Sequence, residues 1–384
     1  MRIGNRRAVL SSILYSLFSI LAAMALSIGI VGLPNVGKST LFSVLTRKAV
    51  DVSNYPFTTI DPNVGVVSVP DSRLATLAAL EHSARVVPAT VKFVDIAGLV
   101  KGANRGEGLG NQFLAQIREV DAIVEVVRAF TAPEIAHVEG VPDPLRDYDI
   151  VDAELALKDL EGIEKRLEQT EKEARAGAKS AQESAHALAA LRDALREGTP
   201  ARVKLAELRG EREREVCERE ARDLALLTAK PLLVLVNATI QKEWMRAAGE
   251  FQKRRIPAVV INLREEQEAA GFVSRERQEL GLGEFPLDRL IRKAFTMLGL
   301  VTFFTTGSDE TRAWTIPVGT FLPQAAGAIH SDFEQQFIRG DVIGWNSLAE
   351  AGGWGHARGK GLLRSEGKSY VVREGDVIEV KHGA

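Results

Sequence analysis

The stretch GIVGLPNVGKST at residues 29–40 constrains this chain more than any other part of its sequence. It fits the pattern G-x-x-x-x-G-K-[ST], with Gly32, Gly37, Lys38 and Ser39 at the fixed positions. A short apolar run precedes the stretch and a helical pattern follows it, which is the context that a phosphate-binding loop requires. Its glycines allow backbone N–H groups to point inward at phosphate oxygens, at the positive end of a helix. We therefore predict that the chain binds a nucleoside triphosphate.

The side chains of this loop have separate expected roles. Lys38 is expected to contact the β- and γ-phosphates and to act in catalysis, while the Ser39 hydroxyl is expected to bind Mg²⁺. Asn35 fits two interpretations, because its carboxamide would either help to hold K⁺ beside the phosphates or make a hydrogen bond that stabilises the loop. The nucleotide-binding residues predicted here are Gly32, Asn35, Val36, Gly37, Lys38, Ser39 and Thr40.

Length and composition set the class of protein. At 384 residues the chain is too long for one ordinary core, so several domains are expected. The 45% apolar and 26% charged content is typical of a soluble globular protein, and a net charge of −2 means that nucleic acid would have to bind a local patch. The single cysteine, Cys217, excludes an internal disulfide and suits a reducing cytoplasm, which is the predicted location.

Residues 1–25 have the basic, apolar and then small-residue order of a secretory signal. Cleavage after Ala25, however, would export a nucleotide-binding protein to a compartment with little ATP. Translation from Met24 instead gives a short lead into the first predicted strand. We interpret 1–25 as an apolar extension from an over-extended start site, with Met24 as the native start, and expect no membrane association.

Short apolar runs alternate with helical patterns through much of the chain. The runs lie at residues 63–69, 91–97, 122–127, 231–237 and 257–263. This alternation predicts an α/β fold with a mostly parallel sheet and crossover helices.

Residues 149–228 break the alternation. They are long, charged and spaced like two amphipathic helices, with a turn predicted at 198–202. We predict an antiparallel helical coiled coil inserted into the nucleotide-binding domain, which comprises 26–148 and 229–300. The insertion is either a solvated arm or an arm that docks a partner.

The character of the sequence changes after a helical pattern at 287–300. Short β-rich runs separated by glycine turns follow, which predicts a small separate sheet domain at 301–384.

A second motif completes the expected Mg²⁺ site. The run VKFVDIAGLV places Asp95 and Gly98 in a D-x-x-G pattern at the end of an apolar strand. We expect Asp95 to bind Mg²⁺, commonly through water, and the Gly98 N–H to contact the γ-phosphate. Thr59 is predicted to supply the second hydroxyl on Mg²⁺, with Thr58 as the alternative. Leu99 follows Gly98 where related switch enzymes have glutamine, so slow intrinsic hydrolysis is expected.

The residues that read the base favour adenine. Guanine recognition normally depends on N-K-x-D after a strand, but here Asn237 is followed by Ala238 and then by Ile240 in place of aspartate. Without that carboxylate the guanine edge lacks its partners, whereas adenine fits against Asn237 and backbone groups. ATP is therefore the predicted ligand, and a GTPase with relaxed base specificity is the alternative.

Four segments together resemble one family. They are GLPNVGKSTLF, DIAGLVKGANRGEGLGNQFLAQIRE, RAWTIPVGTFLPQAAGAIHSDFEQQFIRGDVI and EGKSYVVREGDVIEV. They resemble the YchF family, the Obg-like ATPases, over about residues 26–384. The resemblance implies a ribosome-associated P-loop ATPase with an Obg-type nucleotide domain, a coiled-coil insertion and a C-terminal TGS domain of β-grasp fold. It also implies a link to translation and stress responses, with ribosomal RNA and proteins as partners.

The resemblance also assigns a role to His137. The family proposes that a histidine after the fourth strand replaces the missing glutamine, and APEIAHVEG places His137 at the matching position. An ordinary loop histidine is the alternative. The chain departs from the family pattern at Ile240, where members usually have an acidic residue, and at Glu125, where they often have histidine.

Two classes of function remain open. One is an ATPase switch, in which ATP orders 54–65 and 95–111 and the other domains report that state to the ribosome. The other is an ATP-gated scaffold for RNA or protein, in which hydrolysis is incidental. The complete set Lys38, Ser39, Thr59 and Asp95 favours the enzyme.

Overall fold

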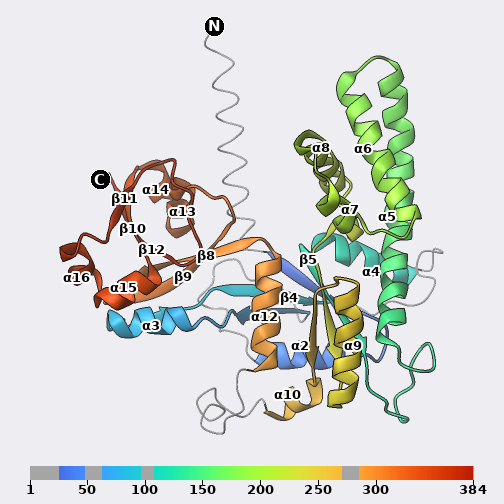
Figure 1. Ribbon diagram of the computed structural model, residues 1–384, viewed down its shortest axis with the longest axis horizontal. Helices are drawn as coiled ribbons and strands as arrows, with labels where there is room; N and C mark the ends of the chain where they lie inside the picture. Colours follow the sequence, from blue (N-terminus) through green and yellow to red (C-terminus); the bar gives the residue numbers. More distant parts are fainter. Residues whose placement is uncertain (1–25, 48–62, 97–107, 270–284, 384) are drawn as a thin grey trace.

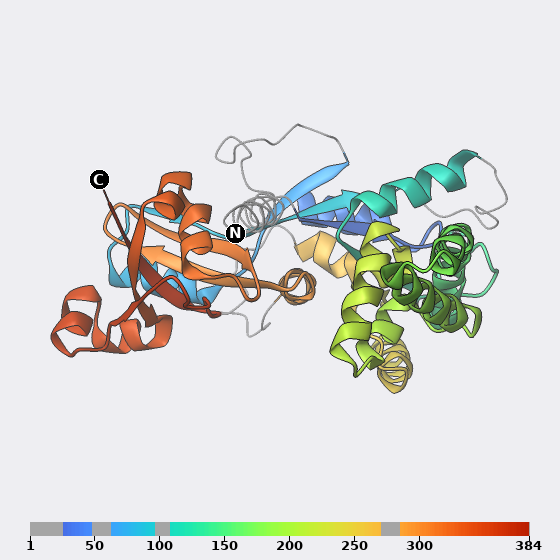
Figure 2. The ribbon, with the colours of Figure 1, turned by 90° about the horizontal axis from the view of Figure 1, so that it is seen from above.

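The computed structural model describes residues 26–47, 63–96, 108–269 and 285–383. These residues form two sheets and a projecting helical arm (Figure 1). The first sheet lies between the arm and the second sheet, and the view from above shows the same order (Figure 2).

The first sheet is mostly parallel and has six strands within the described residues. In spatial order they are β2 (Val64–Ser68), β4 (Thr90–Asp95), β1 (Ser27–Val31), β5 (Ala122–Arg128), β6 (Leu232–Asn237) and β7 (Ala258–Ile261). The exception is β2, which runs antiparallel to β4 at one edge. The α/β sheet predicted from the alternating runs is therefore confirmed.

Helices bury this sheet on both faces at its centre. Every residue of β5 and β6 is buried, as expected for central parallel strands. The covering helix α2 (Lys38–Arg47) packs against β1, β2 and β4, while α9 (Gln241–Lys253) and α12 (Pro286–Met297) pack against β6 and β7. Two more helices, α10 (Leu263–Ala269) beside α2 and α4 (Gly108–Glu119) before β5, complete this part.

The inserted segment forms the arm. Its long helix α5 (Pro144–Arg175) lies antiparallel to α6 (Lys179–Arg196), with α7 (Ala201–Glu207) and α8 (Glu211–Asp223) beside them (Figure 1). Apolar side chains from several of these helices form a separate core within the arm. The arm therefore has a core of its own, while the start of α5 packs in the core of the first sheet.

The turn predicted at 198–202 is wrong as the point where the hairpin reverses. The chain reverses at 176–178 instead, where Gly177 has a φ of 92° that favours glycine. Residues 198–200 only end α6 and lead into α7. Charged residues surround both Gly177 and Gly198, so composition alone does not reveal at which glycine the hairpin reverses.

The second sheet has the strand arrangement expected of a β-grasp domain. In spatial order its strands are β11 (Arg364–Glu366), β10 (Phe337–Gly344), β12 (Asp376–His382), β8 (Leu300–Thr306), β9 (Glu310–Pro317) and β3 (Arg85–Val87). The neighbours β12 and β8 are parallel, with antiparallel β10 and β9 outside them. The helix α13 (Leu322–Ile329) shares a core with this sheet, and α14 (Ser331–Gln335), α15 (Trp345–Ala351) and α16 (Trp354–Gly359) complete the domain.

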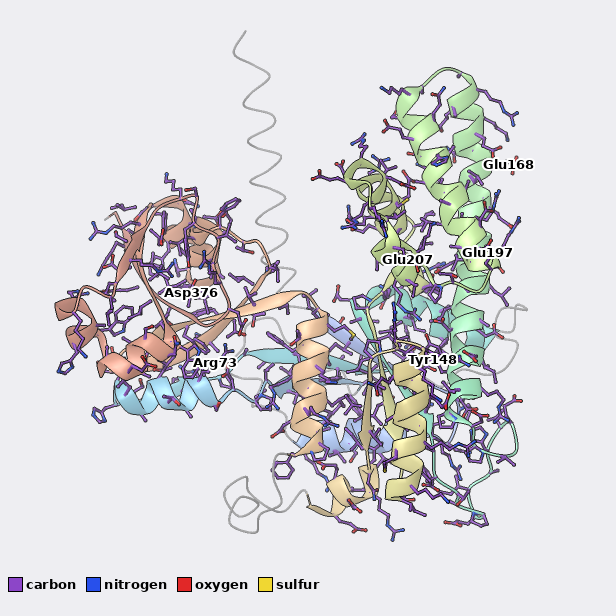
Figure 3. The ribbon with its side chains drawn as sticks, in the orientation of Figure 1. Arg73, Tyr148, Glu168, Glu197, Glu207 and Asp376 are labelled. Atoms are coloured by element: carbon purple, nitrogen blue, oxygen red, sulfur yellow. The ribbon has the colours of Figure 1, made fainter. Side chains whose placement is uncertain are left out.

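One segment of the predicted nucleotide-binding domain packs on the second sheet instead. The helix α3 (Ser72–Leu80) and β3 belong by sequence to 26–148, but β3 pairs with β9 and α3 packs against β8, β9 and α15. Arg73 on α3 binds Glu374 at 2.6 Å, and its Cζ lies 5.1 Å from the centre of the Phe304 ring, at the junction shown in Figure 3. The C-terminal sheet is therefore completed by an earlier part of the chain.

No helix among the described residues combines the length and the apolar composition that crossing a membrane requires. The apolar extension 1–25 lies outside these residues.

Candidate nucleotide-binding site

The predicted phosphate loop joins β1 to α2, which begins at Lys38. Glycine is required at Gly32, where φ is 142° and an added Cβ would lie 2.3 Å from the Val126 carbonyl oxygen. It is also required at Gly37, where φ is 110° and an added Cβ would lie 2.6 Å from the Asn237 amide nitrogen. The loop is therefore packed tightly against the strands beside it, with no room for side chains at these two positions.

Lys38 lies over its own loop. Its Nζ donates hydrogen bonds to the Gly32 carbonyl at 3.1 Å and to the Leu33 carbonyl at 2.9 Å. Burial lowers the pKa of Lys38, an effect that the Asp95 carboxylate opposes, and burial likewise raises the pKa of Asp95 against the influence of Lys38. The structure thus brings together the predicted lysine and the predicted Mg²⁺-binding carboxylate.

A pocket of about 700 Å³ opens at the carboxyl ends of the parallel strands, where ligands of such sheets bind. The predicted residues that line it are Asn35, Gly37, Lys38, Ser39, Thr40 and Asn237. Val36 and Gly32 lie behind this wall, since both are buried. The predictions for Thr58, Thr59, Gly98 and Leu99 fall outside the described residues.

Sequence reasoning missed much of the rest of the pocket. The loop after β5 contributes residues 130–132, 134 and 135, and Thr239 comes from the loop after β6. Asn262 follows β7, and residues 263, 264 and 267 lie on α10. A usable signal was present, because a polar residue occurs within about three positions of the end of each of these strands, at Thr131, Thr239 and Asn262. Loops at the carboxyl ends of parallel strands meet at one edge of the sheet.

Arg128 shapes the loop after β5. It is 1% exposed, and its guanidinium donates to the carbonyls of Phe130, Ala132 and Ile135 at 3.0, 3.2 and 3.1 Å. Its Cζ also lies 4.4 Å from the centre of the Phe130 ring. Since these residues line the pocket, one buried side chain fixes the backbone of an entire wall.

Asn237 braces the phosphate loop from the neighbouring strand. Its Nδ2 donates to the Val36 carbonyl at 3.0 Å, and its Oδ1 accepts from the Leu263 N–H at 3.3 Å. Each end of the amide thus makes a hydrogen bond within the protein, and the role of Asn237 in reading adenine stays a prediction. Ile240 is 56% exposed and does not line the pocket.

The Asn35 side chain contacts the backbone carbonyl of Ala136, the residue that precedes His137. Asn35 has a φ of 61°, and its Nδ2 donates to the Ala136 carbonyl at 3.1 Å. This contact fits the loop-stabilising interpretation, and the K⁺ role stays a prediction.

His137 is buried away from the pocket. Its Nε2 lies 2.8 Å from Asp147 Oδ2, and its Nδ1 accepts from the Glu139 N–H at 3.2 Å. Both ring nitrogens are thus occupied, which leaves none to orient water in this conformation. The geometry favours the alternative, a structural loop histidine, over the catalytic role.

Glu125, which departs from the family pattern, is a carboxylate in an apolar, buried environment. Its side chain is fully buried on β5, and neither carboxylate oxygen has a hydrogen-bond partner among the described residues. Burial raises its pKa well above the ordinary value, and the nearby Asp152 carboxylate adds to the shift. The carboxyl group is therefore held toward its neutral form.

Comparisons with known proteins fit this geometry. Residues 27–149 match the family described as "50S ribosome-binding GTPase", and residues 300–383 match YchF-GTPase_C, described as "Protein of unknown function (DUF933)". The chain is 44% identical over 374 residues to "Ribosome-binding ATPase YchF" of Bacillus subtilis (strain 168), which covers 93% of this chain and 99% of the relative. The chain belongs to the YchF family.

Other members of the family agree. The protein of the same name from Escherichia coli O157:H7 is 42% identical over 365 residues, covering 92% of this chain and 98% of the relative. A solved structure described as the Schizosaccharomyces pombe YchF GTPase matches with a TM-score of 0.80 at 37% identity, covering 93% of this chain and 97% of that one. These names differ in the nucleotide, since the curated relatives are called ATPases and the solved structure a GTPase.

Proposed function

We propose that this chain is a Mg²⁺-dependent ATPase that associates with the ribosome and changes that association according to its bound nucleotide. The observation that carries the proposal is the phosphate loop itself. Gly32 and Gly37 have backbones that exclude side chains, and Lys38 binds carbonyls that a phosphate would replace. The pocket at this loop is large enough for a nucleotide.

The oxygen donors beside the loop suit Mg²⁺. Ser39 lines the pocket with a hydroxyl group, and Asp95 lies close enough to Lys38 for each charge to shift the pKa of the other. No group of three or more His, Cys, Asp or Glu residues able to hold a metal occurs in the described part of the chain. That fits Mg²⁺, which typically uses one or two carboxylates together with phosphate oxygens. When bound, the ion would neutralise charge on the phosphates.

The pocket favours ATP over GTP. Guanine requires an acceptor after β6, but Ile240 points out to solvent, and Glu134 is the only acidic residue among the described residues that line the pocket. Glu134 lies on the loop after β5, so it does not replace the missing aspartate. We propose that Thr239 and Arg264, which line the pocket, contribute to adenine recognition beside Asn237.

We propose the ribosome as a partner because the curated relatives are named ribosome-binding ATPases. The helical arm and the C-terminal sheet lie on opposite sides of the nucleotide-binding sheet, so both are available to report its state (Figure 1). We propose slow intrinsic hydrolysis, with Leu99 in place of glutamine, and activation by K⁺ at Asn35 remains part of the proposal.

The test is ATP turnover of the full chain with Mg²⁺, with and without purified bacterial ribosomes. Lys38→Ala should reduce turnover by about 100-fold, the scale typical of losing one charge-stabilising group. Lys253→Ala is the matched control, because Lys253 makes an exposed ion pair with Glu250 and does not line the pocket. Full turnover in Lys38→Ala would overturn the proposal. ATP-dependent ribosome binding without measurable hydrolysis would instead support the scaffold alternative.

A further inference from the structure

Lys230 connects the end of α4 to the segment by which the chain leaves the arm. Its Nζ donates hydrogen bonds to the carbonyl of Arg118, at 3.1 Å, and to the carbonyl of Val120. These carbonyls lie at the C-terminal end of α4, where a helix leaves acceptors unsatisfied and carries partial negative charge. Lys230 itself lies between the short helix η3 (Leu227–Ala229) and β6. One side chain therefore joins a helix of the nucleotide-binding domain to the end of the inserted segment.

The segment just before Lys230 is held by the long helix of the arm. Asp159 of α5 accepts hydrogen bonds from the N–H groups of Leu227 and Thr228, each at 2.8 Å, and is 2% exposed. We call these three residues the arm seat. Burial raises the pKa of Asp159, and Arg118 on the last turn of α4 is among the groups that oppose this shift. The end of α4 therefore lies near the arm seat through Arg118 as well as through Lys230.

The other end of α4 follows the predicted Mg²⁺ site along the chain. Asp95 ends β4, and α4 is the first helix after it among the described residues. Apolar side chains of α4, namely Phe113, Leu114 and Ile117, are buried in the core of the first sheet. In P-loop switch proteins, the segment after such an aspartate is ordered by contacts with the γ-phosphate and Mg²⁺. A shift of α4 caused by that ordering would act directly on the contacts of Lys230.

The foot of the arm has room to respond beside Lys230. A pocket of about 360 Å³ is lined by Lys230, by Asp121 before β5, and by residues of α8 that include Glu218 and Arg222. Close packing is what normally restricts neighbouring elements to one arrangement. The space at this point therefore allows the foot of the arm to move relative to α4.

We propose that Lys230 transmits the position of α4 to the arm seat, so that a nucleotide bound at the phosphate loop changes how firmly Asp159 holds residues 227–228. The coupling rests on the proposed nucleotide site. It is reciprocal, since a partner that moves the arm alters the affinity for the nucleotide. Lys230 acts here as a positioning residue, because it does not line the nucleotide pocket.

Amide hydrogen exchange of the full chain, with Mg²⁺ and with or without a non-hydrolysable ATP analogue, measures this coupling. The N–H groups of Leu227 and Thr228 are the reporters, because Asp159 is their acceptor. Adding the analogue to the wild-type chain should change their exchange rates by about fivefold or more, the low end of usual couplings. Lys230→Met keeps an unbranched side chain but removes the donor. Its nucleotide-dependent change should fall below about twofold, although the analogue still protects residues 33–37.

Lys172→Met is the matched control on the same arm. The Lys172 side chain is 69% exposed and pairs with Glu168, so this variant should retain the full nucleotide-dependent change. Lys230→Arg keeps a cationic donor and should retain more of the change than Lys230→Met does. Lys230→Gln is the second variant should Lys230→Met fail to fold.

Two results would overturn the coupling. An equal nucleotide-dependent change in Lys230→Met and in the wild-type chain would show that Lys230 only caps α4. The absence of any change at Leu227 and Thr228, in a wild-type chain whose phosphate loop is protected by the analogue, would show that the arm seat does not respond. The absence of protection at residues 33–37 would instead overturn the proposed function, on which the coupling depends.

Discussion

Arg128 buries a guanidinium group with backbone carbonyls as its hydrogen-bond acceptors. Replacing it by methionine would remove three partly buried hydrogen bonds, each worth about 1 kcal/mol. We expect Arg128→Met to lower the free energy of unfolding by about 3 kcal/mol and to weaken ATP binding, because the wall at 130–135 loses its support. Urea denaturation and ATP titration measure the two effects.

Arg254→Met is the control for that change, since Arg254 forms an exposed ion pair with Asp149. It should alter neither quantity measurably. A folded Arg128→Met protein with normal ATP affinity would show that the wall does not need this arginine.

The raised pKa of Glu125 predicts how the free energy of unfolding depends on pH. Folding raises its pKa above the ordinary value of 4.5, so the folded state binds the proton more tightly than the unfolded state does. Its contribution to stability therefore falls as the pH rises from about 4.5 toward the raised value. Glu125→Gln removes this dependence, so the stability of the variant relative to wild type should increase from pH 5 to pH 8.

Unfolding midpoints in urea across this pH range provide the measurement. Glu119→Gln, at an exposed position, is the control and should follow the wild-type curve. A parallel curve for Glu125→Gln would mean that Glu125 titrates normally in the folded chain.

The site is predictable from sequence only where its chemistry is local. Gly32, Gly37, Lys38 and Ser39 occur within eight residues, and the motif fixes both their geometry and their role. The roles of Asn237 and His137 depend on partners from other elements, Val36 in the phosphate loop and Asp147 on α5. No spacing in the sequence reveals those partners.

At the scale of elements, the base of the arm is held by one buried carboxylate. Asp159 on α5 accepts hydrogen bonds from the backbone N–H groups of Leu227 and Thr228 and from the Thr228 hydroxyl, at 2.7 to 2.8 Å. Asp159→Ala should lower the free energy of unfolding by about 3 kcal/mol, because three buried donors lose their acceptor.

Glu161→Gln is the matched control, since Glu161 pairs with Lys158 on the exposed side of the helix. Thermal unfolding followed by circular dichroism distinguishes the two variants. Equal midpoints would show that the apolar core of the arm is sufficient to seat it.

The sequence predicts strands better than turns. Each predicted apolar run overlaps a strand of the first sheet. The runs are most continuous in β5 and β6, because burial on both faces requires apolar residues throughout. The predicted turn lies at 198–202, whereas the hairpin reverses at Gly177, because Gly177 and Gly198 have similar charged neighbours in the sequence. Long-range packing between α5 and α6 determines which of them turns the chain.

At the scale of the whole molecule, α3 and β3 tie the two sheets together. Ser83, between them, donates to the Gly307 carbonyl at 2.7 Å, and Arg73 bridges Asp71 and Glu374. This non-local pairing has no sequence signature, since β3 is three residues long. It means that the C-terminal domain is docked through a segment that follows the first strands of the nucleotide-binding sheet.

The central claim is that this architecture presents a site for ATP. Equilibrium binding of ATP and of GTP to the full chain, with Mg²⁺ and K⁺ present, tests it most directly. We predict tighter binding of ATP than of GTP, because no aspartate follows β6 to read guanine, and loss of both in Lys38→Ala. Equal or tighter binding of GTP would contradict the claim and would place the chain among the GTPases.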